Sequence, residues 1–98
     1  MTTATDIGTL ITQTPGICGG RPCIARKGVS VRRIVVFYRM GETPEELVTQ
    51  LPHLTLAEVH AALAYYHANR EAIDADLARE HAEYDRLAAA HPAERYAQ

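Results

Sequence analysis

The clearest pattern of apolar and polar positions lies near the middle of the chain, directly after Ser30. Its apolar residues recur at positions i, i+3, i+4 and i+7, which is the spacing of one buried face of an α-helix. They are Val31, Ile34, Val35 and Tyr38. Ser30 is a good N-cap residue, and Gly41 readily takes the left-handed conformation that ends helices. The pattern predicts a helix between these two residues.

Two capping boxes follow, each a threonine with a glutamate three residues later. The first, Thr43-Pro44-Glu45-Glu46, has proline at the first helical position and opens a short helix that Pro52 ends. The apolar residues that this helix is expected to bury are Leu47, Val48 and Leu51.

The second capping box, Thr55-Leu56-Ala57-Glu58, opens a longer helix. Its expected buried stripe consists of Leu56, Val59, Leu63 and Tyr66. Its expected exposed front consists of Thr55, Ala57, Glu58 and Ala61. The two helices are predicted to meet across a short turn that contains proline.

After Asn69 the chain is rich in Ala, Glu, Asp and Arg, with apolar residues at helical spacing as far as about Ala90. These residues are Ile73, Leu77, Tyr84 and Leu87. The predicted helix can be a continuation of the preceding one, and His91-Pro92 is expected to end it. Because its apolar stripe is thin, we expect it to pack on a second copy of the chain or on a partner.

The N-terminal part predicts two short strands, from Thr9 to Thr14 and from Pro22 to Arg26, separated by turn residues. The expected fold is therefore mainly α: a short N-terminal β-hairpin-like segment, a three-helix helix-turn-helix-like bundle and a C-terminal helical extension. Residues 1–69 form the expected helix-turn-helix domain, and residues 70–98 form an acidic helical extension.

Composition limits the class of protein. With 98 residues, 47% of them hydrophobic, the chain suffices for one core. No apolar run approaches the roughly 20 residues that a membrane span needs, and no export signal is visible, so we expect a cytoplasmic protein. Cys18 and Cys23 match neither the redox nor the zinc spacing and are expected to be reduced thiols.

Charge is distributed unevenly along the chain. Residues 1–41 hold six basic residues and one acidic residue, a net charge of +5, whereas residues 42–98 hold four arginines and eleven carboxylates, a net charge of −7. Such a division suggests one half that faces a polyanion and another that faces a protein partner. The alternative is two ordinary solvated surfaces.

The helix order is also the layout of a helix-turn-helix DNA-binding module. The front of the predicted recognition helix lacks an arginine or lysine that could form paired hydrogen bonds with guanine. The basic residues instead precede or occupy the first helix, where they could hold phosphates without reading bases. The candidate DNA-binding residues are Arg26, Lys27, Arg32, Arg33, Arg39 and Thr55.

Catalytic and metal-binding patterns are weak. His60 and His67 lie two helical turns apart, about 10 Å, which is too far to share one metal ion. Ser30 is the single serine, and the N-cap role accounts for it; no nucleophile elbow or phosphate-binding loop is present. We therefore expect no enzyme, cofactor, metal or small-molecule substrate.

A series of motifs in fixed order resembles the DUF433 family, small prokaryotic proteins regarded as antitoxin candidates. The motifs are Gly19-Gly20-Arg21-Pro22-Cys23-Ile24, Val29-Ser30-Val31 with Ile34, Gly41 to Glu46, Leu51-Pro52-His53-Leu54-Thr55-Leu56 and Ala62-Leu63-Ala64-Tyr65-Tyr66. The resemblance implies a helix-turn-helix-like fold, a homodimer and a PIN-like nuclease toxin as partner. The family usually has Gly-Thr-Arg where this chain has Arg26-Lys27-Gly28, so a role of the family's arginine does not transfer to Gly28.

Two functional hypotheses follow. In the first, the chain is an antitoxin that binds operator DNA as a dimer through its basic half, while the acidic C-terminal helix covers the toxin. In the second, it is an interaction module that masks a partner nuclease without binding DNA, and its acidic helix mimics nucleic acid. The candidate partner-binding residues are Asp74, Asp76, Glu80 and Glu83.

Overall fold

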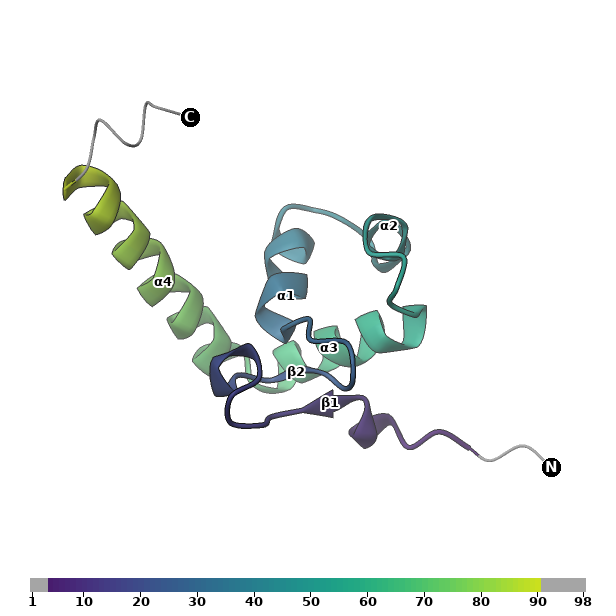
Figure 1. Cartoon of the computed structure of the whole chain (residues 1–98). Coiled ribbons are helices and arrows are strands. Elements are labelled where there is room, and N and C mark those ends of the chain that lie inside the picture. The colour runs from purple at the N-terminus through teal and green to yellow at the C-terminus, as the bar shows by residue number, and fades with distance from the viewer. Residues whose placement is uncertain (1–3, 91–98) are drawn as a thin grey trace.

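A two-stranded hairpin, three packed helices and a projecting fourth helix make up the computed structural model, which describes residues 4–90 (Figure 1). The helices are α1 (Val31–Arg39), α2 (Pro44–Gln50), α3 (Leu56–Ala68) and α4 (Arg70–Ala90). The strands are β1 (Ile11–Thr12) and β2 (Cys23–Ile24), and short 3-10 helices η1 (Ile7–Thr9) and η2 (Cys18–Gly20) precede them. The predicted fold class is confirmed.

The hairpin is shorter than predicted. Its antiparallel strands place Ile11 opposite Ile24. Thr9, expected in the first strand, instead ends η1, whose N-cap Asp6 accepts a hydrogen bond from the Gly8 amide. The second strand stops before Arg26, whose φ of +67° is left-handed and cannot continue a strand.

Helix α1 begins and ends where its sequence predicts. The Ser30 hydroxyl accepts a hydrogen bond of 3.1 Å from the Arg33 amide, and Gly41 has a φ of +97°. Tyr38 differs from its prediction, because it is 36% exposed and meets Tyr66 edge to face instead of filling the core.

Both predicted capping boxes form. In each, the threonine hydroxyl accepts from the glutamate amide, and the glutamate carboxylate accepts from the threonine amide: Thr43 with Glu46, and Thr55 with Glu58. These reciprocal bonds satisfy amide groups that the first turn of a helix leaves without partners.

Helix α3 is the centre of the fold, because α1, α2 and both strands contact it. The predicted exposed front of this helix is therefore partly wrong, since Glu58 and Ala61 are buried. The predicted burial of Leu56 is wrong as well, and its side chain is 42% exposed. Leu56 is the first residue of α3, and helical side chains point back toward the N-terminus, so its side chain lies at the end of the helix.

The core lies between α1, α2, α3 and the hairpin. Its largest fully buried side chains are Cys23, Ile24, Val31, Ile34, Val35, Leu47 and Val59. These residues come from β2 and from all three packed helices, so each of these elements buries its apolar face against the others.

Helix α4 does not continue α3, since Asn69 separates them with a φ of −130°. In Figure 1, α4 runs away from the three packed helices, and the molecule measures 60 × 27 × 23 Å. Ile73 is the one buried residue of α4. The predicted helix end at His91-Pro92 lies outside the described residues.

Candidate functional site

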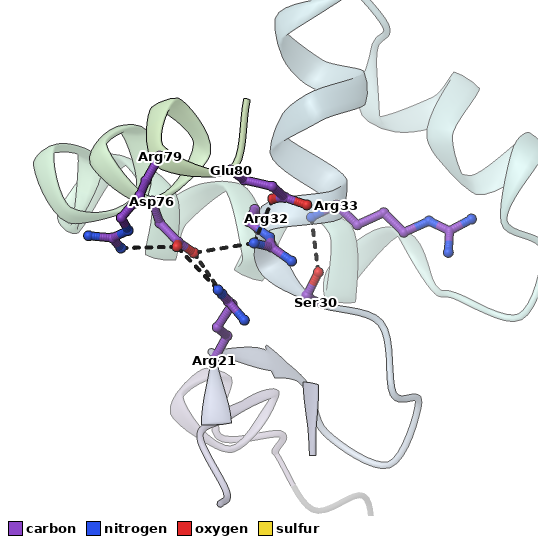
Figure 2. A network of polar contacts seen from close by, with 7 residues as sticks. All are labelled: Arg21, Ser30, Arg32, Arg33, Asp76, Arg79 and Glu80. Carbon is purple, nitrogen blue, oxygen red and sulfur yellow. Dashed lines mark hydrogen bonds and ion pairs between the residues drawn. The ribbon is translucent and has the colours of Figure 1, made fainter. Parts of the chain in front are cut away.

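An arginine and carboxylate network joins α4 to α1 and to the loop before β2. It consists of Arg21, Arg32, Asp76, Arg79 and Glu80 and is drawn in Figure 2. Arg21 Nε donates to Asp76 Oδ2 at 2.8 Å, and Arg79 Nη2 donates to Asp76 Oδ1 at 3.1 Å. Arg32 Nη1 lies 2.6 Å from Glu80 Oε2 and 3.6 Å from Asp76 Oδ2. Three arginines thus surround one carboxylate, Asp76.

The network shifts the pKa values of its members. The hydrogen bond from Arg21 lowers the pKa of Asp76, and Arg79 and Arg32 add to this effect against the opposing effect of burial. The same bond to Asp76 raises the pKa of Arg21. Both groups are therefore charged at neutral pH, and their attraction is electrostatic as well as hydrogen-bonded.

A second cluster, around Asp74, fixes the start of α4. The Tyr66 hydroxyl donates a hydrogen bond of 2.8 Å to Asp74 Oδ1, and Arg39 Nη1 lies 3.7 Å from the same oxygen. Arg70 pairs with Asp74 at 3.8 Å and places its guanidinium over the Tyr66 ring. Since Tyr66 is buried in the core, this cluster ties the first turns of α4 to α3.

A third contact covers the N-terminus of α3. Lys27 Nζ donates to the His53 carbonyl oxygen and lies 3.5 Å from Glu58 Oε1. Glu58 already accepts from the Thr55 amide, so a carboxylate occupies the helix end that a phosphate would otherwise approach. The N-terminus of α3, the predicted recognition helix, therefore carries a negative charge that Lys27 partly balances.

The six candidate DNA-binding residues do not share one free surface. Arg32 and Arg39 pair with α4, Lys27 pairs with Glu58, and Thr55 caps α3. Arg26 and Arg33 are exposed, and within residues 4–90 neither forms an ion pair. Figure 2 shows the Arg33 side chain pointing away from the arginine and carboxylate network.

The four candidate partner-binding residues also fall into two groups, according to whether they pair with the basic half of the chain. Asp74, Asp76 and Glu80 face the basic half of the same chain. Glu83 pairs with Arg86 along α4 itself, which lowers the Glu83 pKa, and its side chain is 56% exposed. Residues predicted for two different partners are therefore in contact with each other.

Arg21 is a member of this site that sequence reasoning did not select. It lies 55 residues from Asp76, beyond the range of any local pattern. Its position in the glycine-rich stretch indicated a loop, and a loop sequence alone does not reveal which helix lies beside it.

Beyond the network, the outer part of α4 exposes apolar surface. Tyr84 is 67% exposed and Leu87 is 47% exposed. An open groove of about 770 Å³ runs between α1 and α4 and reaches Tyr84. Its lining is Val36, Arg39, Asp74, Leu77, Ala78, Glu80, His81 and Tyr84.

Two further properties bear on function. Across residues 4–90, no group of three or more His, Cys, Asp or Glu residues is arranged to hold a metal ion. Within the same range, no helix combines the length and apolar character that a membrane span requires.

The hairpin, the three packed helices and the projecting helix define a small, mainly helical protein with a helix-turn-helix-like arrangement. The family model described as "Protein of unknown function (DUF433)" matches residues 11–66, and the chain belongs to this family. A solved structure of a DUF433 member protein from Anabaena variabilis is similar, with 35% sequence identity and a TM-score of 0.67. The alignment covers 74% of this chain and 71% of that one. Among curated proteins no match is found.

Proposed function

We propose that this chain is an antitoxin that acts by binding, in the cytoplasm, to a PIN-like nuclease and masking it. The proposal joins the resemblance described above to one structural observation: the outer part of α4 projects from the fold and exposes large apolar side chains. The chain acts in this proposal as a homodimeric binding protein and performs no catalysis.

The observation that carries the proposal is the composition of the outer half of α4. Tyr84 and Leu87 lie on one face, three residues apart, and no other part of residues 4–90 buries them. Glu83 and Asp85 flank them. An exposed aromatic anchor with acidic neighbours suits a partner whose own surface is basic, as a nucleic-acid-binding surface is.

The contacts within the chain show which candidate partner-binding residues are available to a partner. Asp74 and Asp76 already have arginine partners within the chain, so their removal would disturb the fold as well as an interface. Glu83 forms its ion pair with Arg86 of α4 itself, and with Tyr84 and Leu87 it forms the outer α4 face that we assign to the partner.

The first experiment is co-purification of the tagged chain with the product of the neighbouring gene. We expect capture of a nuclease, and we expect Tyr84→Ala with Leu87→Ala to weaken it by about 100-fold, as loss of two interface anchors does. A matched control is Met40→Ala with Leu56→Ala, because these apolar side chains, 72% and 42% exposed, are similarly exposed but lie elsewhere. Equal capture by the two double variants would refute the assignment of the outer α4 face.

Operator DNA is the second candidate partner, and the exposed Arg26 and Arg33 favour it because no carboxylate within residues 4–90 engages them. Binding by a dimer would double the phosphate contacts and make the affinity strongly salt-dependent. A salt-titrated gel shift with the chain's own promoter tests it, and no retention at low salt would remove DNA from the proposal.

A further inference from the structure

We propose that α4 occupies a phosphate-binding site on its own chain, so that helix α4 and the backbone of duplex DNA compete for Arg21, Arg32 and Arg39. This inference rests on the DNA-binding part of the proposed function and adds to it a site and a mode of regulation. The site is closed while Asp74, Asp76 and Glu80 lie on these arginines and opens when phosphates displace these carboxylates.

Positive charge from separate elements converges on α4. Arg21 comes from the loop before β2, whereas Arg32 comes from α1, yet both reach Asp76. Arg39 lies seven residues after Arg32, two turns along the same face of α1 and about 10 Å away. The three arginines therefore form a row on one side of the molecule.

The carboxylates that cover this row resemble phosphates in the way they accept hydrogen bonds. Guanidinium groups recognise carboxylates and phosphates through the same fork of N–H donors. Asp76 accepts hydrogen bonds from Nε and Nη2 of Arg21, at 2.8 and 3.4 Å. Two oxygens of a phosphate group accept from the same pair of donors. The α4 carboxylates thus occupy positions where backbone phosphates would bind.

The outer part of α4 is weakly held. The apolar contacts of α4 with the core end at the partly buried Leu77, and beyond that residue the ion pair of Glu80 with Arg32 connects α4 to the rest of the fold. The side chains of Glu80 and Asp74 are 56% and 41% exposed, and ion pairs at such exposed carboxylates contribute little to stability. A polyanion that offers several phosphates at once can therefore displace these carboxylates.

The competition also links the two proposed partners. A protein that binds Tyr84 and Leu87 can draw the outer half of α4 away from Arg32, and this would raise the affinity of the arginine row for DNA. By thermodynamic linkage, DNA on the arginine row would equally favour binding of that protein to α4.

The test compares two double variants of the full chain that add the same charge. Asp76→Asn with Glu80→Gln removes the carboxylates that cover Arg21 and Arg32. Glu45→Gln with Glu71→Gln removes two exposed carboxylates that form no ion pair within residues 4–90. Fluorescence anisotropy with a short mixed-sequence DNA duplex is measured for each over a range of salt concentrations.

The first double variant should bind DNA about tenfold more tightly than the unchanged chain at low salt, with a log–log salt slope steeper by about 2 for two released arginines. The second should change affinity by less than about twofold. Adding Arg21→Gln and Arg32→Gln to the first should abolish the gain. Glu80→Gln alone, at a side chain that is 56% exposed, should give a smaller gain without disturbing the core.

Each other outcome contradicts a defined part of the proposal. If the unchanged chain and the first double variant bind DNA equally well, the DNA-binding function stands and the competition is refuted. An equal gain in both double variants also refutes it, because total charge would then be the cause. No binding by any folded variant, with helicity checked by circular dichroism, would refute both the site and the DNA-binding part of the proposed function.

Discussion

Glu58 stabilises the N-terminus of α3 through its carboxylate. Its carboxylate accepts from the Thr55 amide at 2.8 Å and lies 3.5 Å from Lys27 Nζ. Burial acts to raise its pKa, but the Thr55 hydrogen bonds and the Lys27 charge outweigh burial, so the pKa of Glu58 is lowered. The residue thereby holds a negative charge at the positive end of the α3 dipole.

We predict that Glu58→Gln lowers the free energy of unfolding by about 1 kcal/mol at neutral pH, because the amide loses the charge that attracts Lys27 and the helix dipole. Since the folded-state pKa is lowered, the contribution of the carboxylate is present above the unfolded pKa. It is lost as pH falls through the folded pKa. Urea unfolding of both proteins at neutral pH and near pH 3 checks this.

The control is Glu45→Gln, which removes an exposed carboxylate from the first turn of α2 without breaking a capping box. A difference between the unchanged chain and Glu58→Gln that persists undiminished at acid pH would contradict the electrostatic explanation.

Residue-scale features were predictable where their cause lies within a few residues. The hydroxyl caps at Ser30, Thr43 and Thr55 are local, so the sequence alone places them. The pairing of Arg21 with Asp76 depends on how α4 leaves α3, and no local pattern contains that information.

Helix α4 consists of two parts with different environments. The inner part holds the buried Ile73 and the partly buried Leu77, and Asp74 accepts from the core residue Tyr66. The outer part exposes Tyr84 and Leu87. The thin apolar stripe predicted this helix, but not the break at Asn69, whose side-chain amide donates to the Tyr65 carbonyl and so satisfies the end of α3 locally.

We predict that backbone amides after Leu77 exchange with deuterium much faster than those of the inner part of α4 in the isolated chain. The reason is that the outer turns have few packed contacts, and helix formation alone is marginal for a segment of this length. Residue-resolved hydrogen exchange by NMR measures it. Uniform protection from Ile73 to Ala90 would instead require a second surface, such as another copy of the chain, on the outer half.

At the scale of the whole molecule, the two oppositely charged halves of the sequence lie against each other. Arg21, Arg32 and Arg39 from the basic half pair with carboxylates of the acidic half. The charge division was visible in the sequence, but composition carries no distances, so it could not distinguish two outward surfaces from one internal contact. The radius of gyration, 15.8 Å, exceeds the roughly 13 Å of a compact domain of this length because α4 projects.

The ion pairs between the two halves predict how salt changes the free energy of unfolding. The formal net charge is only −2, so general repulsion is small, and the close pairs between the halves are attractive. Raising NaCl from about 0.05 M to about 0.5 M should therefore lower the free energy of unfolding by about 1 kcal/mol through screening. Asp76→Asn with Glu80→Gln should remove most of this dependence, because these carboxylates carry the pairs with Arg21 and Arg32. Stabilisation of the unchanged chain by NaCl would mean that repulsion within each half outweighs the attraction between them.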